Sequence, residues 1–176
     1  GFAKGLFFGQ YLDQRLEPYP GPRDEKTLKL ERELKEFCAT RIDPVKIDRE
    51  AMISDDVVRG LGEVGVLGAC LPHAAGGRDL TQASYCKLLE VLGGHCASTA
   101  LFVNAHHSIG PRALVLFGTK AQQEKYLPKS ATGEWISAFA LTEPEAGSDA
   151  ANVQTRAEPS ADGKGYVLNG EKRWIT

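Results

Sequence analysis

The sequence of 176 residues contains no hydrophobic run that approaches the roughly 18 residues of a membrane-spanning helix. Its first ten residues, GFAKGLFFGQ, lack the long apolar core and the cleavage site of a signal peptide. Basic residues (21) nearly balance acidic residues (23), so charge gives no reason to expect a nucleic acid or an anionic membrane as partner. With 42% hydrophobic residues, the composition indicates a soluble globular protein of one domain or a domain and a half.

Cysteine is scarce, and its positions form no CxxC pair and no regular spacing. The four cysteines are Cys38, Cys70, Cys86 and Cys96. This pattern favours reduced, buried thiols of an intracellular protein over a disulfide framework. Clustered metal ligands are also lacking, because only the neighbours His95–Cys96 and His106–His107 are close, and adjacent helical residues point about 100° apart. We therefore expect no metal site.

The pattern of residues divides the chain into three regions. Residues 1–23 should be irregular, because EPYPGPR combines three prolines with a glycine. Residues 24–134 have helical periodicity, and residues 135–176 have shorter, strand-like periods. Because helices precede strands and do not alternate with them, we predict an α+β fold with an all-helical N-terminal domain and the beginning of a β domain. The chain starts at Gly1 without Met and ends in an apolar run, so we expect a fragment of a longer protein.

Apolar residues at helical spacing predict helices over residues 25–42, 54–68, 81–96, 97–119 and 120–128. Asp24 and the Ser54–Asp55 pair favour helix starts, whereas Pro44 marks a bend. Residues 97–119 are apolar on all sides and should form a central buried helix. Residues 120–128 should form a short exposed helix that Pro128 stops. In the first helix, the apolar stripe comprises Leu28, Leu30, Leu34, Phe37, Cys38 and Ile42.

The period-2 pattern predicts strands over residues 134–141, 152–159 and 165–176, with LNGEK (residues 168–172) as a tight hairpin. Trp174 and Thr176 then lie two residues apart on one strand face. An indole beside a hydroxyl suits a planar heteroaromatic ring. A half-buried Trp174 that fills the core of the β domain explains the same residues.

Some sequence features resemble functional motifs without their context. GLGEVG (residues 60–65) matches the GxGxxG dinucleotide fingerprint, but no strand precedes it, so it indicates close helix packing and a helix stop. His106 and His107 lie on an apolar helix, as core or interface histidines do. Glu143 and Glu145 are expected to be two exposed acids of a turn, with no part in acid–base chemistry.

The segment ALTEPEAGSDA, residues 140–150, follows a predicted strand and contains the residues of a shaped turn. Pro144 fixes φ, and Gly147 permits a left-handed backbone or a close approach. Ser148 and Asp149 supply oxygens of the capping type. Free amides in such a turn can point at one anion, such as a phosphate. From these residues alone, an ordinary strand-ending turn remains the alternative.

The motif FALTEPEAGSD, followed by YVLNGEKRWIT, resembles the flavin-binding signature of the acyl-CoA dehydrogenase family. FGTKAQQEKYLPKSATGEWISAF resembles the helix-to-strand junction of that family. GFAKGLFFGQ, KIDRE, LGEVGVLGACLPHAAGG and NAHHSIG resemble its very-long-chain branch, including a relative known for complex I assembly. The resemblance covers essentially the whole chain. It implies a helical N-terminal domain (24–134), a β-barrel-like middle domain that begins at 135–176, and a C-terminal helical bundle absent from this chain.

The resemblance also implies an FAD site. Thr142 would hydrogen-bond the polar edge of the isoalloxazine ring, Gly147 and Ser148 would approach the pyrophosphate, and Ser148 would border the acyl-CoA substrate. Trp174 would cover one face of the flavin, and the hydroxyl of Thr176 would point at flavin N5. The implied cofactor-binding residues are Phe139, Ala140, Leu141, Thr142, Gly147, Ser148, Trp174, Ile175 and Thr176.

The reaction that the resemblance implies is the FAD-dependent dehydrogenation of long-chain acyl-CoA to trans-2-enoyl-CoA in fatty-acid β-oxidation. Electrons would pass to an electron-transferring flavoprotein, and the protein would be a dimer or tetramer. Its location would be the bacterial cytoplasm, or the mitochondrial matrix or inner-membrane face. The alternatives are an acyl-CoA oxidase of the same fold and a non-catalytic assembly or scaffold protein.

No catalytic residue is assigned, because the catalytic base of the family is a glutamate of the C-terminal bundle. The fragment alone is therefore expected to bind FAD poorly and to be inactive. Two residues depart from the long-chain pattern: Pro111 stands where a larger residue is usual, and Asn104 places a polar group on the helix expected to line the acyl cavity. A polar residue there could shorten the cavity, so these residues leave the preferred acyl-chain length open.

Overall fold

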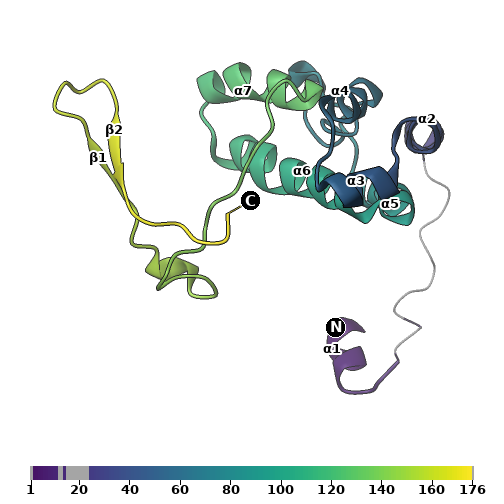
Figure 1. Ribbon diagram of the computed structural model, residues 1–176, viewed down its shortest axis with the longest axis horizontal. Coiled ribbons are helices and arrows are strands. Elements are labelled where there is room, and N and C mark those ends of the chain that lie inside the picture. Colours follow the sequence, from purple (N-terminus) through teal and green to yellow (C-terminus); the bar gives the residue numbers. More distant parts are fainter. Residues whose placement is uncertain (1, 12–13, 15–23, 176) are drawn as a thin grey trace.

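The computed structural model describes residues 2–11, 14 and 24–175. Six helices form one packed body, and a β-hairpin extends away from it (Figure 1). The helices of this body are α2 (Glu25–Arg41), α3 (Pro44–Glu50), α4 (Asp55–Val64), α5 (Gln82–His95), α6 (Ala97–Phe117) and α7 (Lys120–Thr132). The hairpin consists of β1 (Arg156–Pro159) and β2 (Tyr166–Asn169), and short 3₁₀ turns lie at His73–Ala75 and Ala150–Asn152. The predicted order of helices followed by antiparallel strands is confirmed.

Side-chain caps determine where several of these helices begin. Asp24 accepts a hydrogen bond from the Thr27 amide at the start of α2, as its sequence position predicts. Thr81 caps α5 in the same way by accepting from the Ser84 amide. At α7, Thr119 and Gln122 form a reciprocal capping box, in which each side chain bonds the main chain of the other residue.

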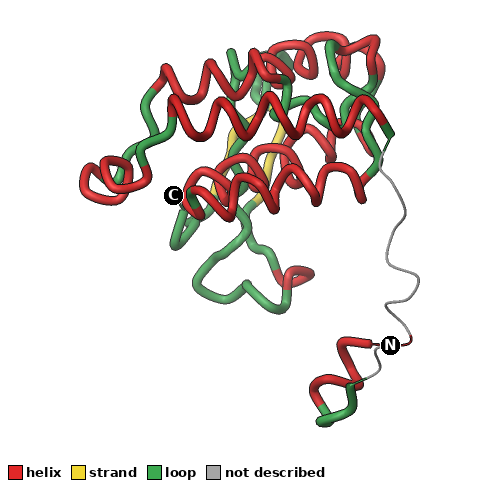
Figure 2. The backbone as a smooth tube through the Cα atoms, turned by 90° about the vertical axis from the view of Figure 1, so that its right-hand side faces the viewer, coloured by secondary structure: helices red, strands yellow, loops and turns green. Residues whose placement is uncertain are grey.

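The apolar core lies between the helices, and α5 packs against both α2 and α6. From a second direction the helices lie in stacked rows (Figure 2). The largest fully buried apolar side chains of this core include Leu34, Leu61, Leu67, Tyr85, Leu88, Leu92 and Val103. A smaller cluster of Leu71, Leu127 and Ala131 joins α7 to the loop before α5. Burial of this apolar surface is the main stabilising contribution in the helical region.

Three expectations about where helices lie are wrong, and two of them concern proline. Residues Phe2–Phe7 form the short helix α1 inside the region expected to be irregular, of which 1, 12–13 and 15–23 lie outside the described residues. Residues Pro44–Glu50 form α3, because Asp43 accepts from the Lys46 amide and proline suits the first helical position. Helix α7 continues through Pro128 to Thr132, because packing holds the residues around this proline in the helix. Leu127, Ser130 and Ala131 are buried.

Helix α6 was expected to be buried all round, but it is buried on one face only. Val103, His106 and His107 face the core, whereas Leu101 and Phe117 are 68% and 84% exposed. Helix α6 therefore carries more apolar side chains than the other described helices cover. Leu28, counted on the apolar stripe of α2, is likewise exposed.

The predicted strand over residues 134–141 is absent, because no described strand pairs with this segment. The hairpin also turns at a different place, since β1 and β2 pair in a register that joins Arg156 to Asn169 and Pro159 to Tyr166. Ser160 and Gly165 close the turn, with the Ser160 amide donating to the Gly165 carbonyl over 2.9 Å. The expected hairpin at LNGEK (168–172) is therefore wrong, and Asn169 ends β2.

All four cysteines are free thiols. Cys38 and Cys96 are buried as expected, but Cys70 is only partly buried and Cys86 is exposed. No helix of the described residues combines the length and the apolarity that crossing a membrane requires.

Candidate functional site

The strongest concentration of polar contacts outside the helices surrounds the carboxylate of Glu143. Its side chain is almost fully buried, with 5% of the residue exposed. The main-chain amides of Gln154 and Thr155 donate to it over 2.6 and 3.1 Å, and the Thr155 hydroxyl donates a third hydrogen bond. Lys172 Nζ lies 2.7 Å from Glu143 Oε1 and completes the set. Both carboxylate oxygens are therefore engaged, which stabilises the charged form.

The same contacts hold two segments side by side that the hairpin separates in sequence. Lys172 Nζ also donates to the Leu141 carbonyl over 3.1 Å. The Arg173 amide donates to the Thr142 carbonyl over 2.9 Å. Residues 141–143 and 172–173 thus form one polar clamp, the name used below for Glu143, Lys172 and these bonded main-chain groups. The clamp brings Trp174 and Thr142 into one small region.

The charge state of Glu143 follows from its partners. Hydrogen bonds from Lys172 and Thr155, together with the Gln154 amide, lower the pKa of the Glu143 carboxyl to about 2. The group is therefore ionised throughout the neutral range. The expectation that Glu143 is an exposed acid of a turn is wrong, because the hairpin returns Lys172 to its carboxylate. Glu145 is exposed as expected.

The turn after Glu143 is closed by its own main chain. The Glu143 amide donates to the Ala146 carbonyl over 2.8 Å, and the Ala146 side chain is buried. Gly147 and Ser148, which follow, are exposed. Nothing lies within 4 Å of a Cβ added to Gly147, and its φ is not in the left-handed region. Gly147 is therefore open to close approach from outside and makes no left-handed turn.

The aromatic residues of this region are turned to the surface. Trp174 is 88% exposed and has a φ of 58°, so the chain bends there and does not continue as a strand. Phe139 and Ile175 are 57% and 42% exposed. Among the described residues, Trp174 therefore fills no apolar core, and the chain at Trp174 is not the strand that was predicted. Thr176 itself lies outside the described residues.

Of the other predicted site residues, Ala140 is exposed, and Leu141 and Thr142 are partly buried beside the clamp. Exposed aromatic side chains, an open glycine and a partly buried hydroxyl fit one face of a planar ring system with a polar edge and an attached phosphate. These residues therefore fit FAD in chemical type. They contain no free buried carboxylate, since Glu143 is fully engaged.

Two sequence features assigned to packing do have that role. GLGEVG lies in α4 and its end, where a Cβ on Gly60 would collide with the Phe37 ring and Gly65 has a φ of 91°. The prediction of close helix packing and a helix stop is confirmed. His106 and His107 are 1% and 2% exposed, so they are core histidines as predicted. His107 stacks on Tyr85 with ring centroids 4.2 Å apart.

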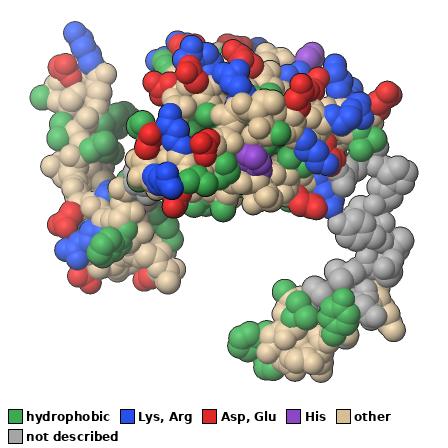
Figure 3. All heavy atoms as spheres, turned by 45° about the vertical axis from the view of Figure 1, so that its right-hand side comes forward, with side chains coloured by type: hydrophobic (Ala, Val, Ile, Leu, Met, Phe, Trp, Pro, Cys, Tyr) green, Lys and Arg blue, Asp and Glu red, His purple; other side chains and the backbone are tan. Residues whose placement is uncertain are grey.

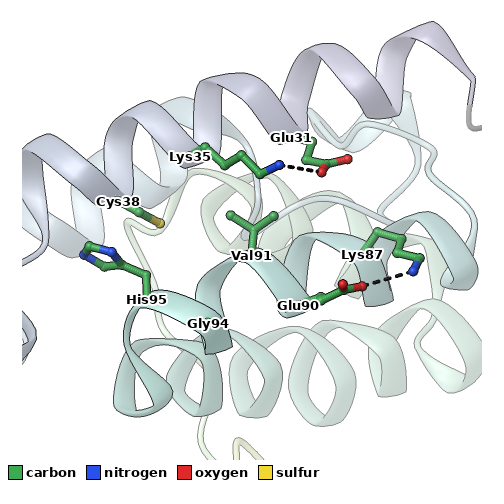
Figure 4. A pocket seen from close by; sticks show the side chains of 8 residues that line it. All are labelled: Glu31, Lys35, Cys38, Lys87, Glu90, Val91, Gly94 and His95. Carbon is green, nitrogen blue, oxygen red and sulfur yellow. Dashed lines mark hydrogen bonds and ion pairs between the residues drawn. The ribbon is translucent and has the colours of Figure 1, made fainter.

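A groove between α2 and α5 offers a second candidate site (Figure 4). Its charged side chains pair along each helix: Lys35 with Glu31 over 2.9 Å, and Lys87 with Glu90 over 3.0 Å. His95 at its end is hydrogen-bonded to the Ile42 carbonyl. Figure 3 shows basic and acidic side chains interspersed over the helical surface, without a patch of one sign on that face. The groove therefore offers charge pairs typical of a helix surface, and the region of the clamp is the better candidate.

Comparisons with known proteins match both regions of the chain. The family model of the acyl-CoA dehydrogenase N-terminal domain matches residues 24–134, and that of the acyl-CoA dehydrogenase middle domain matches residues 138–176. The chain is 44% identical to the human mitochondrial very long-chain specific acyl-CoA dehydrogenase, over 99% of this chain and 27% of that protein. It therefore spans about a quarter of the length of the curated relatives it matches.

Solved structures match the fold. An acyl-CoA dehydrogenase of Bacillus anthracis, complexed with FAD, is 36% identical with a TM-score of 0.76, over 89% of this chain and 27% of that one. The butyryl-CoA dehydrogenase of Megasphaera elsdenii is 30% identical with a TM-score of 0.79, over 89% of this chain and 42% of that one. Each match covers 89% of this chain, which is more than the part that ends with the last helix at Thr132. The similarity therefore extends beyond the helical region.

The clamp itself was missed by reasoning from the sequence. Glu143 and Lys172 are far apart in the chain, and no local spacing rule pairs them. Their only signal is that the first motif contains acids and the second contains the basic pair Lys172 and Arg173.

Proposed function

The chain belongs to the acyl-CoA dehydrogenase family, and on this basis we propose that the protein catalyses the FAD-dependent dehydrogenation of acyl-CoA to trans-2-enoyl-CoA. The observation that supports this most strongly is the polar clamp. It joins the two motifs of the flavin signature, which the hairpin separates, through Lys172 to Glu143 and Arg173 to Thr142. Residues 24–134 then act as the helical N-terminal domain and 135–176 as the beginning of the middle domain.

The residues that hold FAD in this proposal come from both sides of the clamp. Phe139 and Trp174 supply aromatic surface for the ring system, and Ala140, Leu141 and Ile175 border it. The Thr142 hydroxyl hydrogen-bonds the polar edge of the ring. Gly147 and Ser148 approach the pyrophosphate, Ser148 also borders acyl-CoA, and Thr176 completes the set. Bound FAD supplies the group that accepts the hydride removed from the β-carbon of the substrate.

The described residues position and bind, and they do not remove the α-proton. A general base must be able to accept a proton at the operating pH. Glu143 cannot, because its partners hold its pKa at about 2 and occupy both oxygens. We propose that the base is a carboxylate supplied by chain beyond residue 176, as the resemblance implies.

Substrate length, electron acceptor and location are parts of the same proposal. The similarity to a very long-chain specific enzyme favours long acyl chains. Partly buried Asn104 on α6 and the buried Pro111 within that helix are the residues expected to alter chain-length preference. An electron-transferring flavoprotein is the proposed acceptor and a dimer or tetramer the proposed assembly. The proposed location is the bacterial cytoplasm or the mitochondrial matrix or inner-membrane face.

The test is anaerobic reduction of the full-length protein purified with FAD. Acyl-CoA substrates with short, medium and long chains are added one at a time, and flavin absorbance and enoyl-CoA are measured together. Bleaching with equimolar enoyl-CoA, strongest for long chains, is expected. A protein without flavin absorbance, or with flavin that no acyl-CoA bleaches, would contradict the proposal and leave the scaffold role. Peroxide formation in air without an added acceptor would identify an oxidase instead.

A further inference from the structure

His106 stands where the helical region meets the flavin segment, the name used here for residues 138–142. Its Nε2 lies 3.0 Å from the Ser130 carbonyl of α7, and the Ser137 amide donates to its Nδ1 over 3.1 Å. A main-chain amide can only donate, so Nδ1 must be unprotonated and Nε2 must hold the proton. Both bonds therefore require the neutral Nε2–H tautomer.

The surroundings of His106 favour the neutral imidazole. Burial lowers the pKa of the His106 imidazole, while the Ser130 carbonyl acts in the opposite direction. The neighbouring His107 differs in its partner, since its Nε2 accepts from the Cys70 amide over 3.0 Å. Two buried histidines on one helix thus differ: His107 bonds the helical domain, whereas His106 bonds both the helical domain and the chain that leaves it.

Gly110 brings the same chain onto α6. It lies four residues after His106, on the same face of the helix. A Cβ added to Gly110 would collide with both the Cβ and the Oγ of Ser137. Ser137 therefore rests directly on the helix backbone, held by a hydrogen bond from one side and by close contact from the other.

Ser137 is the last fixed point before the flavin segment. Among the described residues, no hydrogen bond joins Ala138, Phe139 or Ala140 to the rest of the chain, and the next one is accepted by the Leu141 carbonyl from Lys172. The position of Phe139 relative to the helices is therefore set at Ser137, and its position relative to the hairpin is set at the clamp.

We propose that His106 and Gly110 are positioning residues that place the flavin segment against the helical domain, so that FAD affinity depends on both although they lie outside the signature motifs. This inference rests on the proposed function, because it concerns how the same site is assembled. It assigns His106 a role in cofactor binding that its burial as a core histidine does not suggest.

The first test is Gly110→Ala in the full-length protein, with Gly94→Ala as the matched control. Both are helical glycines, and alanine is the better helix former at each. A Cβ at Gly94 meets nothing within 4 Å, whereas at Gly110 it displaces Ser137. We expect the dissociation constant of FAD to rise about tenfold for Gly110→Ala, as loss of one well-formed contact does, and to stay within about twofold for Gly94→Ala. Equal affinity in Gly110→Ala and the wild type would overturn the proposal.

The second test separates the hydrogen bond from burial. His106→Asn keeps an oxygen where Nδ1 accepts from Ser137, whereas His106→Leu keeps none. FAD affinity should fall about tenfold for His106→Leu and about threefold or less for His106→Asn. His107→Leu is the control, and it should lower the unfolding midpoint without changing FAD affinity. Equal loss of affinity in the two His106 variants, or in His107→Leu, would overturn the proposal. If His106→Leu does not fold, Gly110→Ala decides.

A readout without flavin distinguishes this inference from the proposed function. In the FAD-free protein, Gly110→Ala should speed amide hydrogen exchange at residues 137–142 and leave the helices unchanged. A wild type that binds no FAD would refute the proposed function, while this exchange comparison would still test the junction. A wild type that binds FAD, with unchanged exchange and affinity in Gly110→Ala, would refute the inference alone.

Discussion

The helical region and the region from residue 138 to residue 175 are ordered by different interactions. In the helical region, apolar side chains from five helices pack into one core, in which Leu34, Leu61 and Leu88 are fully buried. In the second region, Tyr166, Val167 and Leu168 of β2 are exposed, and order comes from the hydrogen bonds and ion pair around Glu143. Apolar burial stabilises the first region, whereas polar contacts position the second and leave its apolar surface open for other groups.

The largest difference between the regions should appear on truncating one leucine in each. Leu88→Ala, at a fully buried site, should lower the free energy of unfolding by about 3 kcal/mol. Leu168→Ala, at a site that is 72% exposed, should change it by less than about 0.5 kcal/mol. Urea unfolding of the 176-residue chain, followed by circular dichroism, measures both. Similar losses for the two variants would show that the hairpin shares the helical core.

Acid should weaken the two regions in different pH windows. Burial lowers the pKa of the His107 imidazole from 6.5 to about 4 in the folded chain. The unfolded chain therefore binds more protons between these values. The contribution of His107 to the free energy of unfolding is fully present above pH 6.5 and is lost as the pH decreases towards 4. The charge of nearby Arg112 acts in the same direction as burial.

The clamp should withstand a lower pH than the helical region does. Because the pKa of Glu143 is lowered from 4.5 to about 2, its contribution is present above pH 4.5 and is lost only as the pH falls towards 2. Thermal unfolding of the helices between pH 7 and 4, compared with an NMR titration of Glu143, checks both windows. A helical region whose stability is constant from pH 6.5 to 4 would contradict the assignment of His107 as a neutral buried group.

A smaller and more local effect is expected for Glu143→Gln. The amide of glutamine removes the charge that Lys172 pairs with and presents a donor to groups that already donate. Amide exchange at Gln154, Thr155 and Arg173 should become about tenfold faster, with the helices unaffected. Glu145→Gln, in the same turn but exposed, is the matched control, and it should leave amide exchange unchanged both at these three residues and in the helices. Equal exchange in the two variants would mean that the clamp does not order this region.

What the sequence could predict depended on whether the deciding contact was local. Asp24 and the GLGEVG segment act through neighbours a few residues away, and both predictions hold. Pro128 predicts a helix stop, but packing of Leu127 and Ala131 outweighs its missing amide. Residues 134–141 alternate like a strand, yet the described chain supplies no partner strand.

The candidate site divides in the same way. Its residue types, such as Phe139, Thr142 and Trp174, were identifiable from the motifs. The burial of Glu143 was not, because it depends on where the hairpin returns the chain, and the turn at Ser160–Gly165 was itself misplaced in the sequence prediction. Long-range polar contacts of this kind have no local pattern in a single sequence.

Amide hydrogen exchange of the full-length protein with and without FAD tests the central claim most directly, namely that the second region, positioned by the clamp, holds the cofactor at its two motifs. We expect FAD to slow exchange in residues 139–148 and 174–175 by about tenfold or more, with little change in the buried core of α2, α5 and α6. Protection confined to the helices, or none at the two motifs beside Glu143 and Lys172, would contradict it.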